Sequence, residues 1–172
     1  REDLFNPTFI IEMKKLQDNV APIEFKLAKS VIEIQLGKRI EEVFDSIDEN
    51  PIGVASIGIA YRAKLISGEQ VVIKVQRPKI KRMILTDFEI IDFIVGNLEK
   101  MSDELKYLGI KRVIDDFFKS IKLELNYKIE ANNNIKFQTN LKKIDKEGII
   151  VVPNIFKEFS TEKVLVMEFL EG

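Results

Sequence analysis

The chain has 172 residues, of which 45% are hydrophobic and 32% charged, and its formal net charge is −1. This length suits a single core or one lobe of a larger protein, and the near balance of 27 basic and 28 acidic residues gives no general attraction to nucleic acid. Cysteine and histidine are both absent, which excludes disulfides, zinc fingers, thiol nucleophiles and histidine bases within this sequence. Any catalysis would therefore rest on carboxylates, Lys, Arg, Tyr and hydroxyl groups.

The N-terminal part is predicted to be helical. Asn6-Pro7 is typical of a helix start, and apolar residues at helical spacing continue to Val20. A second helix is predicted from Pro22 to Gly37, where the glycine suits a C-terminal stop. Residues 44–47 are predicted to form a short strand, and 48–51 a loop.

A β-hairpin is predicted next, with strands at Ile57–Leu65 and Glu69–Gln76 joined by a turn at Ser67-Gly68. The second strand contains Lys74 among β-branched residues. A lysine there is costly to bury unless an anionic group meets it, and the alternative is an edge-strand lysine that faces water.

The segment before the hairpin, 51–58, is rich in small residues. Gly53 and Gly58 have the spacing of a P-loop, but Ile59-Ala60 stands where a P-loop requires Lys and Ser or Thr, so a P-loop is excluded. The backbone N–H groups of such a segment can approach phosphates closely, and a plain hairpin turn is the alternative.

Two long helices are predicted after Pro78, the first at Ile80–Met101. The second runs from Ile110 to Leu125, with a continuation through Ile135 toward Leu141. On one continuous helix Glu124 and Glu130 would lie about 120° apart around the axis, so we expect them to have different partners. Solvated surface charge is the alternative for each.

The last part of the chain is predicted to form short strands at 149–152, 154–159 and 163–169, with a turn at 160–162. A basic cluster also follows the lysine strand. It has two interpretations, a solvated connection or contact with a membrane headgroup or an acidic partner. Its members are Lys74, Arg77, Lys79, Lys81 and Arg82.

With these elements assigned, the whole chain resembles the N-terminal lobe of the UbiB-like (aarF-domain) atypical protein kinases. Val72–Pro78 is close to the V-K-V-Q-R-P signature of that family, and 51–58 resembles its alanine-rich loop. Residues 124–132 resemble its E-L-D-(Y/F)-x-x-E-A-x-N motif. Further similarity is found at Leu16–Val20, Leu36-Gly37, Val152-Pro153 and Ser160–Glu168.

The resemblance implies an α+β fold, a protein-kinase-like N-lobe. An antiparallel sheet would carry long helices inserted after the lysine strand, with helices leading in from the N-terminus. We expect residues 1–43 to be an N-terminal helical extension. Residues 44–172 would be the lobe itself, cut at the hinge and without the C-lobe.

The same resemblance implies a catalytic ion pair in a nucleotide site. Lys74 would contact the phosphates, and Glu130 would be its partner. Ala55 and Ser56 would lie in the loop over the phosphates. The cofactor would be ATP or ADP, with Mg²⁺ in the full-length protein.

Other site residues follow from the resemblance as well. Met167 would lie near the gatekeeper position, and Glu168, Phe169 and Leu170 would offer hinge backbone groups to adenine. Glu124 would be the first acid of the E-x-D motif.

Two departures from the family pattern concern this site. Asn126 replaces the Asp of the E-x-D motif, which puts a role for a second carboxylate there in doubt. Gly53 and Val54 replace the usual Ala-Ala, which could change loop flexibility and nucleotide preference.

We interpret the chain as a fragment of an atypical kinase or ATPase that is inactive by itself. By resemblance, the K-x-G-Q element precedes Arg1, and the catalytic-loop and D-F-G aspartates follow Gly172. The alternative is a pseudokinase or scaffold that contacts an isoprenoid-lipid enzyme or a membrane. An unrelated helical interaction domain would require all the motif similarities to be accidental.

We expect a nucleotide as partner, an isoprenoid lipid or membrane surface through the full-length protein, and no nucleic acid. The longest uncharged run, 50–61, is too short to span a bilayer. We therefore expect a cytoplasmic protein, with membrane association of the full-length protein left open. Whether the substrate is protein, lipid or water is also open.

Overall fold

The computed structural model describes residues 23–102, 104, 107–145 and 148–171. The helix predicted between Asn6 and Val20, including the Leu16–Val20 similarity, lies outside these residues. Within the described ranges we find no helical segment with the length and hydrophobicity of a transmembrane span.

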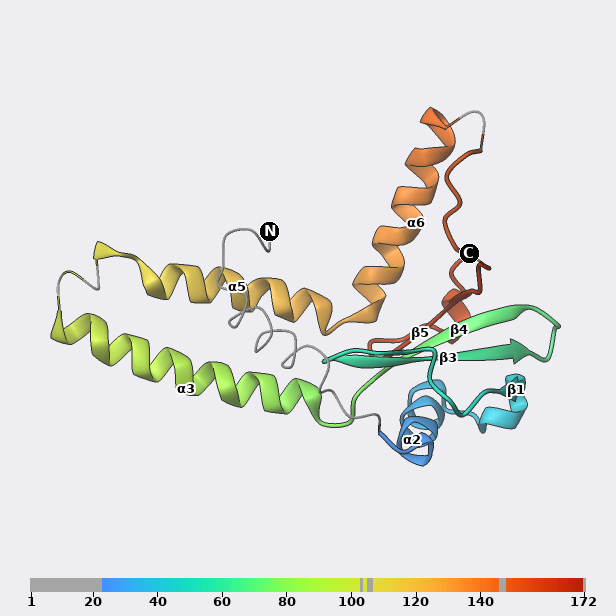
Figure 1. Ribbon diagram of the computed structural model, residues 1–172, viewed down its shortest axis with the longest axis horizontal. Helices are drawn as coiled ribbons and strands as arrows, with labels where there is room; N and C mark the ends of the chain where they lie inside the picture. Colours follow the sequence, from blue (N-terminus) through green and yellow to red (C-terminus); the bar gives the residue numbers. More distant parts are fainter. Residues whose placement is uncertain (1–22, 103, 105–106, 146–147, 172) are drawn as a thin grey trace, which may run out of the picture.

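An antiparallel sheet forms the body of the molecule (Figure 1). Strands β1, β3, β4 and β5 lie in that order, and β2 also pairs with β3. The predicted hairpin is confirmed, because β3 and β4 are joined at Ser67-Gly68, where Gly68 has the φ of 106° that favours glycine. The strands are β1 (Phe44–Ile47), β2 (Gly53–Val54), β3 (Gly58–Leu65), β4 (Gln70–Gln76) and β5 (Val164–Glu168).

The two faces of the sheet carry different helices because side chains alternate along each strand. Val71, Ile73 and Val75 of β4 are fully buried in a core that includes Ala28 and Ile32 of helix α2 (Phe25–Leu36). The intervening residues of β4 and β5 point to the opposite face, where Leu165 packs with Tyr127 and Ala131 of helix α6 (Tyr127–Ile144). Lys74 therefore points away from the main core and toward α6.

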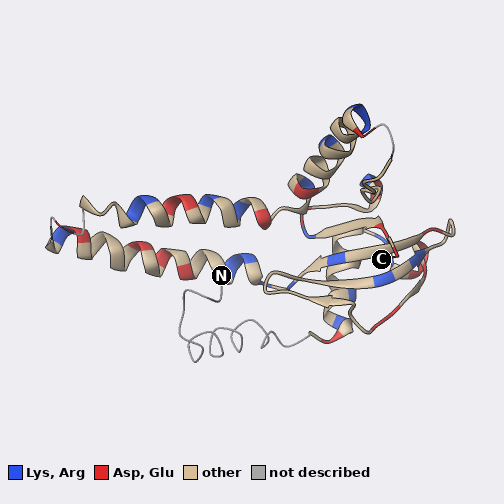
Figure 2. Cartoon of the chain, turned by 45° about the horizontal axis from the view of Figure 1, so that its top comes forward, with Lys and Arg blue, Asp and Glu red and all other residues tan. Residues whose placement is uncertain are grey.

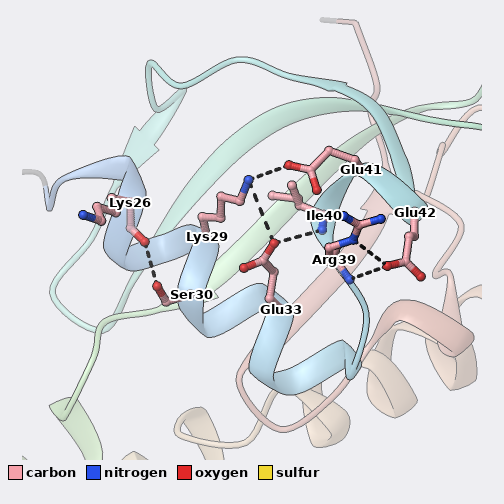
Figure 3. A network of polar contacts seen from close by, with 8 residues as sticks. All are labelled: Lys26, Lys29, Ser30, Glu33, Arg39, Ile40, Glu41 and Glu42. Atoms are coloured by element: carbon pink, nitrogen blue, oxygen red, sulfur yellow. Dashed lines mark hydrogen bonds and ion pairs between the residues drawn. The ribbon is translucent and has the colours of Figure 1, made fainter.

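Helix α2 ends as predicted at Gly37, which adopts the left-handed φ of 64°. Salt bridges and hydrogen bonds then fix the short 3-10 helix η2 (Ile40–Glu42) against it, as Figure 3 shows. Lys29 pairs with Glu33 and Glu41, and its hydrogen bond lowers the pKa of the Glu41 carboxyl. Since Lys29 and Glu33 are partly exposed and Glu41 is exposed, the network orients the chain entering β1 more than it stabilises the fold.

Helices α3 (Ile80–Met101) and α5 (Ile110–Glu124) run side by side and project from the sheet as a helical arm (Figure 1). Phe88 of α3 stacks on Phe118 of α5 with ring centroids 4.1 Å apart. Neither helix contains a buried residue. The α+β architecture and the two long helices inserted after the lysine strand are confirmed.

The predicted continuation of the second long helix is wrong. Helix α5 ends at Glu124, and α6 begins at Tyr127 with Asn126 as its N-cap. The Asn126 side chain accepts a hydrogen bond from the Lys128 amide at 3.0 Å. Glu124 and Glu130 thus belong to different helices, and the angle of about 120° expected for a continuous helix does not apply.

Two of the three strands predicted at the end of the chain are also wrong. Residues 149–152 are irregular, and within 154–159 only Ile155 forms an isolated bridge, to Met167. Lys157–Phe159 forms a 3-10 helix, η3, instead. The strand predicted at 163–169 is confirmed as β5.

Candidate functional site

The Lys74 ammonium group lies 2.9 Å from both carboxylate oxygens of Glu130, so β4 and α6 meet in a bidentate ion pair. The Lys74 ammonium also lies 4.8 Å from the centre of the Tyr127 ring, within cation–π range. The Lys74 and Glu130 side chains remain 33% and 43% exposed. Because water screens such a pair, its contribution to stability is at most about 1 kcal/mol, and its main effect is to fix the position of the ammonium group.

This ion pair forms one wall of a cleft of about 680 Å³ between the β2–β3 turn and α6. The predicted residues Ala55, Ser56, Glu124 and Glu130 all line it together with Lys74. The remaining lining residues are Ile57, Gly58, Leu123, Tyr127, Ile129, Asn133, Asn134 and Phe137. The structure thus brings five of the predicted site residues to one cavity.

The small-residue segment is a tight turn over this cleft. The Ala55 amide donates to the Gly58 carbonyl at 2.9 Å, which leaves Ser56 and Ile57 at the tip. Neither the Ser56 nor the Ile57 amide donates a hydrogen bond to the backbone of another described residue. These N–H groups can therefore serve an anionic ligand.

Arg77, which directly follows β4, hydrogen-bonds to the turn and anchors it to the sheet. Its Nε donates to the Ala55 carbonyl at 3.0 Å, and its backbone amide donates to the Ile57 carbonyl at 2.9 Å. Two successive contacts from one residue fix the height of the turn above β4.

Tyr127 supports the same turn from the α6 side. Its hydroxyl is buried, has no hydrogen-bond partner among the described residues, and lies so close to Gly58 that a Cβ there would be 2.2 Å away. Burial, together with the Glu130 carboxylate, raises the pKa of the Tyr127 hydroxyl, so it stays neutral beside Lys74.

Gln76 organises the corner between α5 and α6. Its side chain is only 2% exposed and donates from Nε2 to the Leu125 carbonyl at 2.8 Å and to the Glu162 carbonyl at 3.2 Å. The Tyr127 amide donates to the same Glu162 carbonyl at 3.0 Å. The corner that carries Glu124 and Glu130 is thereby tied to the end of the lysine strand.

The other predicted residues do not line the cleft. Asn126 caps α6, and Met167 packs against the cluster of Tyr127, Ala131 and Leu165 on the α6 face of the sheet. Glu168 accepts hydrogen bonds from the Asn154 amide and side chain at 3.1 and 2.7 Å, and Leu170 is 39% exposed beyond β5. Among the described residues there is no cluster of three or more acidic side chains that could hold a metal ion.

Several residues of the site were missed by sequence analysis. Gln76 and Arg77 stand in the same signature as Lys74, and Tyr127 stands between two predicted residues. Asn133, Asn134 and Phe137 follow Glu130 at helical spacing, so the placement of Glu130 on a helix could have identified them.

Comparison with known sequences shows the relationship directly. Residues 15–172 match the family model of the ABC1 atypical kinase-like domain, which is most of the chain. The chain belongs to this family.

Relatives of this ABC1-family chain agree with the resemblance to UbiB-like kinases. An uncharacterised chloroplast aarF domain-containing protein kinase of Arabidopsis thaliana is 38% identical over 173 residues, which cover 100% of this chain and 24% of the relative. A probable protein kinase UbiB of Shewanella sp. is also 38% identical, over 100% of this chain and 31% of its own length. The chain thus spans about a quarter to a third of these relatives.

A solved structure gives the same result for the fold. The Mycobacterium tuberculosis protein Rv3197, determined in complex with erythromycin, superposes with a TM-score of 0.67 at 25% identity. The match covers 99% of this chain and 42% of that one.

Proposed function

We propose that this chain is the nucleotide-binding N-lobe of an atypical kinase or ATPase, with ATP or ADP as its ligand. The observation that carries the proposal is the Lys74–Glu130 ion pair, which holds an ammonium group in the same cleft as the Ser56 and Ile57 amides, neither of which donates to the backbone of another described residue. Membership of a kinase-like family supports nucleotide use in general. Lys74 and Glu130 act as the catalytic pair in this proposal.

The residues present fit a nucleotide phosphate group. Lys74 supplies a positive charge, and the Ser56 and Ile57 amides supply neutral donors at the rim of the same cavity. We further propose that Met167, Glu168 and Leu170 hold adenine at the end of β5. The groups that bind Mg²⁺ and drive phosphoryl transfer would lie in the remaining part of the full-length protein, so that this chain alone is inactive.

The test is nucleotide binding by the full-length protein with Lys74→Ala. Loss of a charge-assisted contact should weaken ATP affinity at least about tenfold in isothermal titration calorimetry. Lys64→Ala is the matched control, because this substitution removes an equal charge outside the cleft. Lys64 of β3 pairs with Asp45 of the neighbouring strand β1 at 3.2 Å. Equal affinity of the Lys74→Ala variant and the unmodified protein would overturn the proposal.

A pseudokinase that acts as a scaffold is the second candidate. The large apolar side chains exposed on the helical arm favour it, among them Phe93, Met101 and Val113. In this case the full-length protein binds nucleotide but shows neither ATP hydrolysis nor phosphotransfer when isoprenoid lipid is added. Measurable turnover under those conditions excludes the scaffold and supports the kinase or ATPase.

A further inference from the structure

The cleft between the β2–β3 turn and α6 depends on one cation for its positive charge. Lys74 is the single basic side chain among the described residues that line it. Figure 2 shows α6 standing over the sheet that carries this lysine, with an acidic position in its first turn. The other members of the predicted basic cluster do not line the cleft, namely Arg77, Lys79, Lys81 and Arg82. The exact position of the Lys74 ammonium group therefore decides what an anionic ligand meets there.

The hydrogen bonds of Lys74 leave one donor for a ligand. A lysine ammonium has three N–H groups and no acceptor. Both carboxylate oxygens of Glu130 lie 2.9 Å from it, and among the described residues the ammonium has no other hydrogen-bond acceptor. Since the Lys74 side chain is 33% exposed and lines the cleft, the third N–H can reach a bound group.

The Tyr127 ring stabilises the same ammonium without a hydrogen bond. The Lys74 Nζ atom lies over the ring, 4.8 Å from its centre, where the negative face of the π-system attracts a cation. Tyr127 and Glu130 are three residues apart on α6, so one face of the helix presents the ring and the carboxylate together. A carboxylate or amide in place of the ring would accept the third N–H, whereas an aromatic face attracts the cation as a whole.

Tyr127 is itself held in place by its surroundings. Its side chain is only 1% exposed, and its amide donates to the Glu162 carbonyl at 3.0 Å. The hydroxyl lies against Gly58 and has no hydrogen-bond partner among the described residues. Because an unpaired buried hydroxyl opposes folding, the ring is the part of this side chain that serves the cleft.

We propose that Tyr127 is a positioning residue, whose ring face holds the Lys74 ammonium so that its third N–H points to the phosphate of the nucleotide. The inference rests on the proposed nucleotide site and adds the residue that prepares the lysine for its ligand. Tyr127 acts through Lys74 and not on the nucleotide.

The first test needs no nucleotide. Full-length protein is prepared with isotope-labelled lysine, and the ε-methylene signal of Lys74 is identified by its absence from the spectrum of Lys74→Arg. The ring current of Tyr127 should shift this signal upfield. Tyr127→Phe should keep the shift, and Tyr127→Leu should lose it. An unshifted Lys74 signal in the unmodified protein, or an equal shift in the Leu variant, would overturn the proposal.

The second test changes the charge of the ring face and keeps its size. Pentafluorophenylalanine at position 127 has nearly the shape of phenylalanine, but its ring face is no longer negative. ATP affinity in isothermal titration calorimetry should be about threefold or more weaker than that of Tyr127→Phe. When Lys74→Ala is also present, the same ring change should alter affinity by less than about twofold. Equal affinity of the Phe and pentafluorophenylalanine variants would overturn the role of the ring.

Tyr61→Leu is the matched control. Tyr61 of β3 is also fully buried with an unpartnered hydroxyl, but it belongs to the main core on the other face of the sheet. Its loss should lower stability, yet leave the Lys74 signal in place and ATP affinity within about twofold of the unmodified protein. Loss of the upfield shift in Tyr61→Leu as well as in Tyr127→Leu would overturn the proposal, because general loosening of the fold would then explain it.

The outcomes also separate this role from the nucleotide site itself. If Lys74→Ala leaves ATP affinity unchanged, the nucleotide site fails, and the role of Tyr127 fails with it. If Lys74→Ala weakens binding while the two ring variants bind equally well, only the role of Tyr127 fails.

Discussion

Gly58 stands where the sheet, the turn between β2 and β3, and α6 meet. A Cβ at this position would lie 2.2 Å from the Tyr127 hydroxyl and 2.9 Å from the Val75 carbonyl oxygen. The second neighbour is backbone and cannot move without disturbing β4. Close approach, rather than an unusual φ, is therefore the physical reason for a glycine here.

We expect Gly58→Ala to destabilise the protein by about 1–3 kcal/mol, the usual cost of overpacking a tight site. Urea unfolding followed by circular dichroism measures this change. Gly53→Ala is the control, since its Cβ would meet only Ala60 Cβ at an ordinary 3.9 Å. If both variants unfold at the same urea concentration, the Tyr127 contact does not restrict Gly58.

The sequence is informative about Lys74 for a simple reason. An ammonium group within a β-branched strand needs an anionic neighbour, and the kinase resemblance indicated Glu130. Tyr127 gave no comparable signal, because an aromatic residue near a helix start has many possible environments. Its contact with Gly58 depends on how α6 is placed over the sheet, which is a tertiary property.

At the scale of elements, the break between α5 and α6 determines the site. The segment from Ile110 to Leu141 contains no Gly or Pro, so its apolar spacing predicts one helix. Asn126 is a good N-cap, and this signal was available. The hydrogen bonds that stabilise the break involve residues distant in sequence. The Gln76 side chain donates to the Leu125 carbonyl, and the Tyr127 amide donates to the Glu162 carbonyl.

We expect Gln76→Leu to lower the free energy of unfolding by about 1–3 kcal/mol, because the substitution leaves the Leu125 carbonyl without its side-chain donor in a buried setting. Thermal and urea unfolding measure the loss. Gln70→Leu, at the exposed start of the same strand, should change stability by less than about 0.5 kcal/mol. Equal stability of the two variants would show that the corner does not depend on Gln76.

At residues 149–152 the local sequence predicts a strand that the structure does not form. Its β-branched residues favour a strand, yet Ile149, Ile150 and Val151 are exposed and pair with no described strand. Strand formation requires a partner, and among the described residues the open edge of β5 gains a single isolated bridge, from Ile155 to Met167. The sequence pattern predicts a strand, but it does not predict whether another strand lies beside it to form hydrogen bonds.

At the scale of the whole molecule, burial is unevenly distributed. The centre of the sheet is fully buried, with Ile73 and Val75 at 0% exposure, whereas α3 and α5 contain no buried residue. Within the described part of the chain, the arm packs mainly through contacts between α3 and α5 and between α5 and α6. Its stability therefore rests on contacts such as the Phe88–Phe118 stack.

We expect the helical arm to open without unfolding of the sheet. In native-state hydrogen exchange, amides of α3 and α5 should exchange through an opening of lower free energy than those of β3 and β4. Amides at the centre of α2, which pack on the sheet through Ala28 and Ile32, should behave like the strands and serve as the internal control. A single opening free energy shared by the arm and the sheet would contradict this expectation.

The position of β5 has a consequence for biosynthesis. Lys74 in β4 pairs with Ala60 on one side and with Leu165 on the other, so one neighbour precedes it closely and the other is translated about 90 residues later. While the ribosome makes the intervening helices, the edge of β4 stays open on a nascent chain rich in Val and Ile. A chaperone that shields this edge during translation would protect the strand that carries Lys74 from pairing with other polypeptides.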